Sequence, residues 1–375
     1  MNSDKMTPSA PAPEPATTEP VTTEPPEPSA TEPPTTAAAG PGRRWKRPRP
    51  RRQWQADLSV LLVVAAAVVV LSIGVPYVVT AALLGVLISA ACYGLFAMGT
   101  NVLVGWSGLI TFGQAAFFGA GGYCVALMHT TAISPPLKLL IAGAITAAAG
   151  LVLAVGLARF LHITFAMLTL VAGQLIYLVA FQTNLVGGEN GIAPVLRGSV
   201  AGISIETDVN FWPYAVIVLA VISVCYWRFY RSMFVLRLMA SRDDELRAQS
   251  LGLSVVALRG VAGAVAGGVA GIGGGLYAQY AGAINPTLLY FDMSGIAIFM
   301  CLLGGARYLW GPLVGGLIYA VGVGDFLSNT NQPDVYIGIA FMLLIIVLPG
   351  GLLSLKSRLG NASWPARARA RKGTT

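Results

Sequence analysis

Apolar runs follow one another from residue 58 to residue 355, separated by short polar segments. A helix needs roughly 20 predominantly apolar residues to cross a membrane, and most of these runs are that long. Such a succession excludes a soluble enzyme and predicts an all-α polytopic membrane protein with about ten transmembrane helices. The predicted spans are 58–79, 82–104, 112–130, 137–158, 163–184, 211–229, 257–281, 293–305, 309–327 and 335–354.

Some of these helices are expected to be broken. Residues 293–305 are too short to cross the membrane alone at about 1.5 Å per residue, so we expect a broken unit with 309–327 around Gly304, Gly305 and Gly311. Another glycine-rich interruption lies within 105–122. Equal numbers of predicted spans flank the 185–210 loop, so a 5+5 repeat in this chain would be an inverted one.

The basic residues predict the orientation. The chain has 24 Lys and Arg, and only 11% of its residues are charged, compared with roughly 25% in an ordinary globular domain. With a cytoplasmic N-terminus, all of these cations except Lys138 and Arg197 fall on the inner side of the membrane. We therefore expect a multi-pass protein of the inner (cytoplasmic) cell membrane with both termini in the cytoplasm, and no nucleic-acid partner.

The chain divides into three parts by composition. Residues 1–57 are a Pro/Thr/Glu-rich segment ending in a basic run, which predicts a disordered cytoplasmic tail that is dispensable up to residue 42. Residues 58–355 form the transmembrane domain, whose largest inner loop is 228–256. Residues 356–375 form a basic cytoplasmic tail.

Signatures of catalysis and of metal binding are missing from the sequence. Lys356-Ser357 follows a leucine instead of the glycine-rich loop that cradles phosphate. His129 and His162 stand alone, and the 4 cysteines lie singly inside apolar runs. We expect no catalytic residue, no metal site and no cofactor.

The inner loop contains a predicted short helix at 241–252. Ser241 is a good N-cap with Asp244 at the capping-box position, and Gly252 is a natural stop. Leu246, Ala248 and Leu251 leave an apolar edge on a charged body. A helix lying on the membrane surface is the alternative, but acidic residues in the first turn disfavour contact with anionic lipid. The pattern favours a docking helix for a cytoplasmic partner.

Two further sets of residues suggest packing and transport roles. Gly263, Gly267, Gly271 and Gly275 recur every fourth residue, which lets a second helix approach closely, either as static packing or as a sliding interface. Polar groups inside spans usually face the bundle interior, where they line a pathway or bond to another helix. The candidate pathway residues are Gln114, Gln174, Tyr177 and Asn184, of which the last three share one helical face.

Several blocks of the sequence resemble one family in order and spacing. They are NVLVGWSGLITFGQAAFFGAGGY (101–123), LHITFAMLTLVAGQL (161–175), GGENGI (187–192), LRLMASRDDELRAQSLGLSV (236–255) and LLGGARYLWGPLVGG (302–316). Together they are similar to branched-chain amino acid ABC transporter permeases of the LivM type over about residues 58–355.

The resemblance implies an importer of several subunits. This chain would pair with a second permease subunit, two cytoplasmic ATP-binding subunits and an extracytoplasmic solute-binding protein. The block 236–255 would be the loop that contacts the ATPase. Its candidate residues are Arg237, Ser241, Arg242, Asp243, Asp244, Glu245, Leu246, Ala248, Leu251 and Gly252.

Other functions stay open at this point. Relatives of this family also carry urea and short amides. An ion-coupled secondary carrier would need an intramembrane carboxylate or a half-helix site, yet Asp292, Asp325 and Asp334 all lie near helix ends. A passive channel for a small neutral solute would work without the helix at 241–252.

Overall fold

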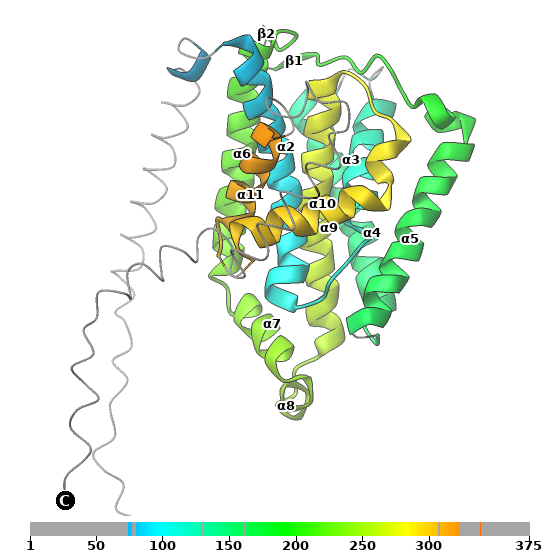
Figure 1. The fold of residues 1–375 in the computed structure, drawn as a ribbon, viewed down its shortest axis with the longest axis vertical. Coiled ribbons are helices and arrows are strands. Elements are labelled where there is room, and N and C mark those ends of the chain that lie inside the picture. Colours follow the sequence, from blue (N-terminus) through cyan, green and yellow to red (C-terminus); the bar gives the residue numbers. More distant parts are fainter. Residues whose placement is uncertain are drawn as a thin grey trace, which may run out of the picture. The chain divides into compact units, whose positions relative to one another are not determined.

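The computed structural model describes residues 80–322 apart from 129–130, 132, 161, 201 and 307, and also residues 74–76 and 338. Most of the first and last predicted spans, the end of the span 309–327 and both predicted tails lie outside the described residues. The described part is built mainly of helices (Figure 1).

Helices long and apolar enough to cross a membrane occupy 5 of the predicted spans. They are α2 (Ala81–Asn101), which continues as the π-helix η1 (Val102–Ser107), α4 (Pro135–Leu157), α5 (His162–Gln182), α6 (Asp208–Tyr230) and α9 (Val255–Ala281). Their bounds agree with the spans predicted from 82, 137, 163, 211 and 257 to within a few residues. The described region is therefore a helical membrane protein, as the apolar runs predict.

Shorter apolar helices lie between the long ones. They are α3 (Gln114–Leu127), α10 (Phe291–Gly304) and α11 (Gly311–Val321). The predicted break between α10 and α11 is present, because Gly305 takes a φ of 103° and ends α10. Figure 1 shows α10 running across the long helices instead of along them.

The glycine-rich interruption predicted within 105–122 is present, and the helix in the predicted span 112–130 is shorter than expected. Gly108, with a φ of 72°, ends η1, and residues 108–113 are not helical. The helix α3 therefore begins only at Gln114 and is 14 residues long. At about 1.5 Å per residue it covers roughly 21 Å, less than the roughly 30 Å of a bilayer core. Such a half-length helix is tolerated because protein surrounds its N-terminal end.

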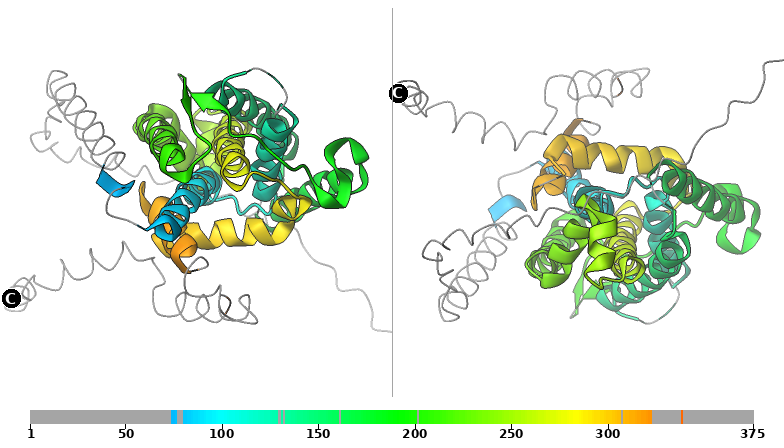
Figure 2. Two further views of the ribbon diagram at one scale, coloured as in Figure 1. Left: turned by 90° about the horizontal axis from the view of Figure 1, so that it is seen from above. Right: turned by 90° about the horizontal axis from the view of Figure 1, so that it is seen from below.

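Helix α9 lies at the centre of the described bundle. It packs against α4, α3, α2 and α6, as the views along the bundle show (Figure 2). Large, fully buried side chains of its neighbours include Trp106, Phe96, Phe118 and Phe211. By contrast, α5 lies at the periphery and exposes large apolar side chains at every fourth position, as expected of a lipid-facing or partner-facing helix.

The two predicted loops lie at opposite ends of the long helices (Figure 1). At one end, residues 184–207 contain η2 (Asn184–Val186), η3 (Gly188–Asn190) and a small antiparallel pair formed by β1 (Ser199–Val200) and β2 (Ile203–Ser204). A bridge between Ile192 and Ile284 ties this loop to the segment before η4 (Pro286–Leu289). At the other end lie α7 (Met233–Asp243) and α8 (Glu245–Ser250).

Candidate coupling and transport sites

Helix α8 begins later than the sequence predicts. Asp244 has extended backbone angles, and its carboxylate accepts the N–H of Arg247 at 3.0 Å, so Asp244 is the N-cap. The predicted N-cap, Ser241, instead lies inside α7, where it is buried and its hydroxyl donates to the carbonyl of Leu238 at 2.8 Å. The serine belongs to the buried face of the preceding helix, which overrides its capping preference.

The predicted end of α8 is confirmed. Gly252 has a φ of 78°, its N–H donates to the carbonyl of Gln249 at 2.9 Å, and the next N–H, of Leu253, reaches the carbonyl of Ala248 at 3.1 Å. This is the Schellman pattern, in which a glycine in the left-handed region closes a helix.

Gly252→Val is expected to loosen the end of α8 without any steric contact, since no atom lies within 4 Å of the position that a Cβ would take. The left-handed backbone costs a β-branched residue about 1–2 kcal/mol. Hydrogen exchange of the α8 amides should accelerate. Gly252→Asn, which tolerates this conformation, should stay close to the wild type. Equal protection of α8 in the valine variant would contradict the assignment.

The surface of α8 combines apolar and acidic side chains. Leu246 is 78% exposed and Leu251 is 76% exposed, while Ala248 faces inward. Asp243 and Asp244 are exposed beside them. Exposed leucines rimmed by charges are typical of a protein-docking surface.

Two arginine side chains connect α7 and α8 to the membrane helices. Arg242 donates to the carbonyl of Gly105 in η1, whereas Arg237 is exposed on α7. The buried Arg259, in the first turns of α9, donates to Glu245 of α8 at 2.8 Å and to the carbonyl of Ala158 at the end of α4 at 2.6 Å. The sequence analysis missed Arg259; its signal is a single cation just inside an apolar helix.

The glycine face of α9 lies against α4 and α3 of the same chain. A methyl group added to Gly267 would lie 2.6 Å from the carbonyl oxygen of Thr146, and one added to Gly275 would lie 2.8 Å from Leu139. Gly263 faces Ala154, and Gly271 faces the Thr146 side chain. The helix backbones therefore approach one another without room for side chains at these positions.

The predicted pathway residues do not all lie together. Gln114 starts α3 and is fully buried, with no hydrogen-bond partner for its carboxamide among the described residues. Gln174 on α5 is half-buried and lies near Gln114. The residues that precede these two glutamines pack closely, because a methyl group added to Gly173 would be 3.3 Å from the α-carbon of Gly113.

The other two predicted pathway residues lie further along α5 and beyond its end. Tyr177 packs its ring against Tyr290, with centroids 5.2 Å apart. Asn184 is exposed at the start of η2.

The short helices α3 and α10 meet at their N-terminal ends. The N–H of Ala115 donates to the hydroxyl of Ser294 at 2.8 Å, and both Ser294 and Gln114 are fully buried. Short helices that meet at their N-terminal ends are typical of the discontinuous helices that form transport sites in membrane proteins. Sequence reasoning missed Ser294, because a single serine in an apolar run carries no distinctive pattern.

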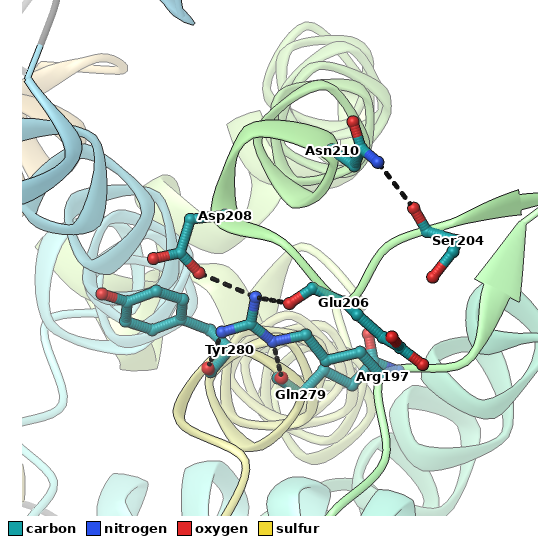
Figure 3. A network of polar contacts seen from close by, with 7 residues as sticks. All are labelled: Arg197, Ser204, Glu206, Asp208, Asn210, Gln279 and Tyr280. Atoms are coloured by element: carbon teal, nitrogen blue, oxygen red, sulfur yellow. Dashed lines mark hydrogen bonds and ion pairs between the residues drawn. The ribbon is translucent and has the colours of Figure 1, made fainter.

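Arg197, one of the two exceptions to the predicted charge distribution, lies at the centre of a polar network (Figure 3). Its guanidinium donates to the carbonyls of Gln279 at 3.2 Å and Tyr280 at 2.7 Å, at the end of α9. It also binds the carbonyl of Glu206 at 2.9 Å and the carboxylate of Asp208 at 2.7 Å, at the start of α6. Arg197 therefore holds the loop 184–207 against α9 and α6. This structural role explains why a cation lies at the end of the bundle where the charge distribution predicts few.

A model of the family described as branched-chain amino acid transport system / permease component matches residues 82–348. The chain belongs to this family. The resemblance predicted from the sequence blocks is thereby confirmed, and the matched range contains α7, α8 and the short helices α3 and α10.

Curated relatives agree with this assignment. The high-affinity branched-chain amino acid transport system permease protein LivM of Escherichia coli is 26% identical over 315 residues, covering 77% of this chain and 74% of the relative. LivM of Salmonella typhimurium is 25% identical over 315 residues with the same coverage, 77% and 74%. The probable permease LivH of Methanocaldococcus jannaschii is 25% identical over 259 residues, 65% of this chain and 79% of the relative. No solved structure matches the chain.

Proposed function

We propose that this chain is the transmembrane permease subunit of an ABC importer that moves branched-chain amino acids across the cytoplasmic membrane. Family membership supports a transport role, and the printed names of the relatives suggest the solute. The importer would contain a second permease subunit, two cytoplasmic ATP-binding subunits and an extracytoplasmic solute-binding protein. Ten spans with both termini in the cytoplasm, in a 5+5 inverted arrangement, remain part of this proposal.

The observation that carries the proposal is the exposure of Leu246 on α8 and of Leu251 at its end. Leu246 and Leu251 lie at the end of the bundle opposite to β1 and β2 (Figure 1). The distribution of basic residues predicts that this end faces the cytoplasm, so a cytoplasmic partner could contact both leucines. The sequence has no phosphate-binding loop, so in an ATP-driven importer hydrolysis would have to take place on a docked protein.

The contacts of Arg259 suggest how docking would act on the membrane helices. Glu245 of α8 and Ala158 of α4 are both bound to this side chain, and α4 is packed closely on α9 by the glycines. A displacement of α8 would therefore move α4 and α9 as one unit. The opposite end of α9 is held by Arg197, so the movement would reach the loop 184–207.

In this proposal the solute passes through the bundle interior next to Gln114. Its buried carboxamide is uncharged and has hydrogen-bonding capacity left among the described residues, which suits brief contact with a polar solute. Gln174, which lies near Gln114, would line the same part of the path, whereas Tyr177 and Asn184 lie further toward the loop end.

Leu246→Arg is expected to abolish retention of the ATP-binding subunits, because it places a charge in the apolar centre of the docking surface, where charged residues are disfavoured. The full complex, purified from the native membrane through a tag on this chain, would be analysed by mass spectrometry. Leu196→Arg is a matched control, since Leu196 is 63% exposed in the loop at the other end of the bundle. Unchanged ATPase retention in Leu246→Arg would contradict docking at α8.

The same purification separates the proposed function from its rivals. Recovery of two ATP-binding subunits and a second permease is the expected result. A chain that is recovered alone and still transports solute would be a secondary carrier or a channel. Retention of ATPases with uptake of urea instead of leucine would identify the short-amide branch of the family.

A further inference from the structure

A cavity opens between α2, α6, α9 and α11 in the half of the bundle that contains Arg197. Its volume is about 430 Å³, within the range of small-molecule sites. The lining residues are Ala81, Ala82, Gly85, Val86, Ser89, Tyr93, Asp208, Tyr277, Tyr280 and Ala320. The residues of α2 recur every three to four positions from 82 to 93, so one face of this helix forms a wall about 17 Å long.

The polar groups of this cavity are hydroxyls and one carboxylate. Ser89, Tyr93, Tyr277 and Tyr280 contribute hydroxyls, and Asp208 contributes the only charge among the lining residues. Ala82, Val86 and Ala320 supply small apolar walls. A chamber with one anionic group, several hydroxyls and apolar walls fits a small solute that carries both charges and a short apolar side chain.

Asp208 can accept a further hydrogen bond. Arg197 binds its Oδ1 atom at 2.7 Å, and a carboxylate offers acceptor sites on both oxygens. Figure 3 shows the second carboxylate oxygen and the Tyr280 hydroxyl directed to the same side, away from the guanidinium. Because Arg197 is occupied by the carbonyls of Gln279, Tyr280 and Glu206, it anchors Asp208 from behind.

The inner end of the cavity is closed by aromatic rings. The ring of Tyr93 lies 5.7 Å from that of Tyr277 and 5.2 Å from that of Tyr319, and 6.3 Å from that of Phe118 on α3. Gln114 lies one turn from Phe118 on the same face of α3, and its carboxamide is fully buried without a partner among the described residues. Separation of these rings would open a route from the cavity to Gln114.

We propose that this cavity is the outer solute-binding pocket of the permease, in which Asp208 receives the ammonium group of an amino acid and the hydroxyls receive its carboxylate. The proposal rests on the proposed function and adds a site to it. Aromatic faces stabilise an ammonium group and hydroxyls donate to a carboxylate, so both ends of the zwitterion have partners. The alanines and the valine leave room for a short branched side chain.

Thiol labelling tests the pocket directly. Val86→Cys would be introduced after the native cysteines are replaced, in the complete complex in proteoliposomes. Leucine at roughly ten times its apparent dissociation constant should slow labelling by a small aqueous thiol reagent about tenfold, because an occupied pocket excludes the reagent. The α-hydroxy acid of leucine, which has a hydroxyl in place of the ammonium group, should give much weaker protection. No labelling at all, or equal labelling with and without leucine, would overturn the proposal.

Two paired substitutions separate binding from structure. Asp208→Asn should remove protection by leucine, whereas Glu206→Gln, which removes an exposed carboxylate from the same network but leaves the carbonyl that binds Arg197, should retain it. Loss of protection in both variants would show that negative charge at this end of the bundle matters without a specific contact from Asp208, and would overturn its role as the ammonium partner.

A volume change gives a second, independent test. Gly85 lies directly beside the Tyr280 hydroxyl, 2.7 Å from the position of an added Cβ, so Gly85→Leu should fill the cavity by steric bulk and lower leucine uptake about tenfold. Gly156→Leu on α4, where no atom lies within 4 Å, is the matched control. Normal uptake in Gly85→Leu would contradict the proposed pocket but not the proposed function. Absence of leucine uptake in the wild-type complex would instead contradict the proposed function.

Discussion

Gly267→Leu is expected to lower the midpoint of thermal aggregation of the detergent-solubilised protein by about 5 °C or more. A side chain at this position would meet the backbone carbonyl of Thr146 at 2.6 Å and the α-carbon of Gly150 at 3.3 Å. Backbone atoms in two packed helices cannot move aside as a side chain can, so α4 and α9 would have to separate. That separation would expose the small-residue surfaces along the whole crossing.

The chain offers a control with the same change in side-chain volume. Gly156 lies on α4 but faces open space, so Gly156→Leu should leave the midpoint close to that of the wild type. Equal midpoints for Gly267→Leu and the wild type would mean that α4 and α9 do not cross as closely as described. A large loss in both variants would mean that added bulk on α4 or α9 destabilises the protein whichever way it faces, and would not support the close crossing.

Arg259→Gln is expected to reduce ATP-driven uptake about tenfold or more, because a neutral amide cannot hold both of the arginine's partners. The guanidinium joins Glu245 of α8 to Ala158 of α4 from a buried position in α9. Without it, α8 would be attached to the bundle mainly through the chain itself. Hydrolysis by the docked ATPase should continue while uptake falls, which a loss of assembly would not produce.

Neighbouring residues separate the two contacts of Arg259. Arg159 is exposed next to Ala158, so Arg159→Gln removes a charge at the same end of α4 and should transport normally. Glu245→Gln removes only the ion pair and should give an intermediate loss. Wild-type coupling in Arg259→Gln would show that movement of α8 reaches the membrane helices by another route.

The sequence predicts the long helices well, because each is a run of apolar residues long enough to span a bilayer. The break at Gly305 and the stop at Gly252 were also predictable, since both glycines take positive φ values that other residues adopt at a cost. The family was recognisable from the order of several blocks, and the match to residues 82–348 confirms it.

The remaining features depend on contacts between distant segments. Ser241 has the local pattern of an N-cap, but burial against the bundle places it inside α7 and leaves the cap to Asp244. Arg259 and Arg197 could be noticed as isolated cations, yet each also binds a backbone carbonyl far away in the sequence, that of Ala158, 101 residues from Arg259, and that of Gln279, 82 residues from Arg197. The cavity beside Asp208 is formed by four helices, none of which indicates it alone.

The most direct test of the importer assignment is uptake of radiolabelled leucine into proteoliposomes that contain this chain with its co-purified subunits and its solute-binding protein. Uptake should require ATP on the side of the membrane that α8 faces, and it should persist when ion gradients are collapsed. Uptake that needs no ATP and stops when a proton or sodium gradient is collapsed would contradict the account.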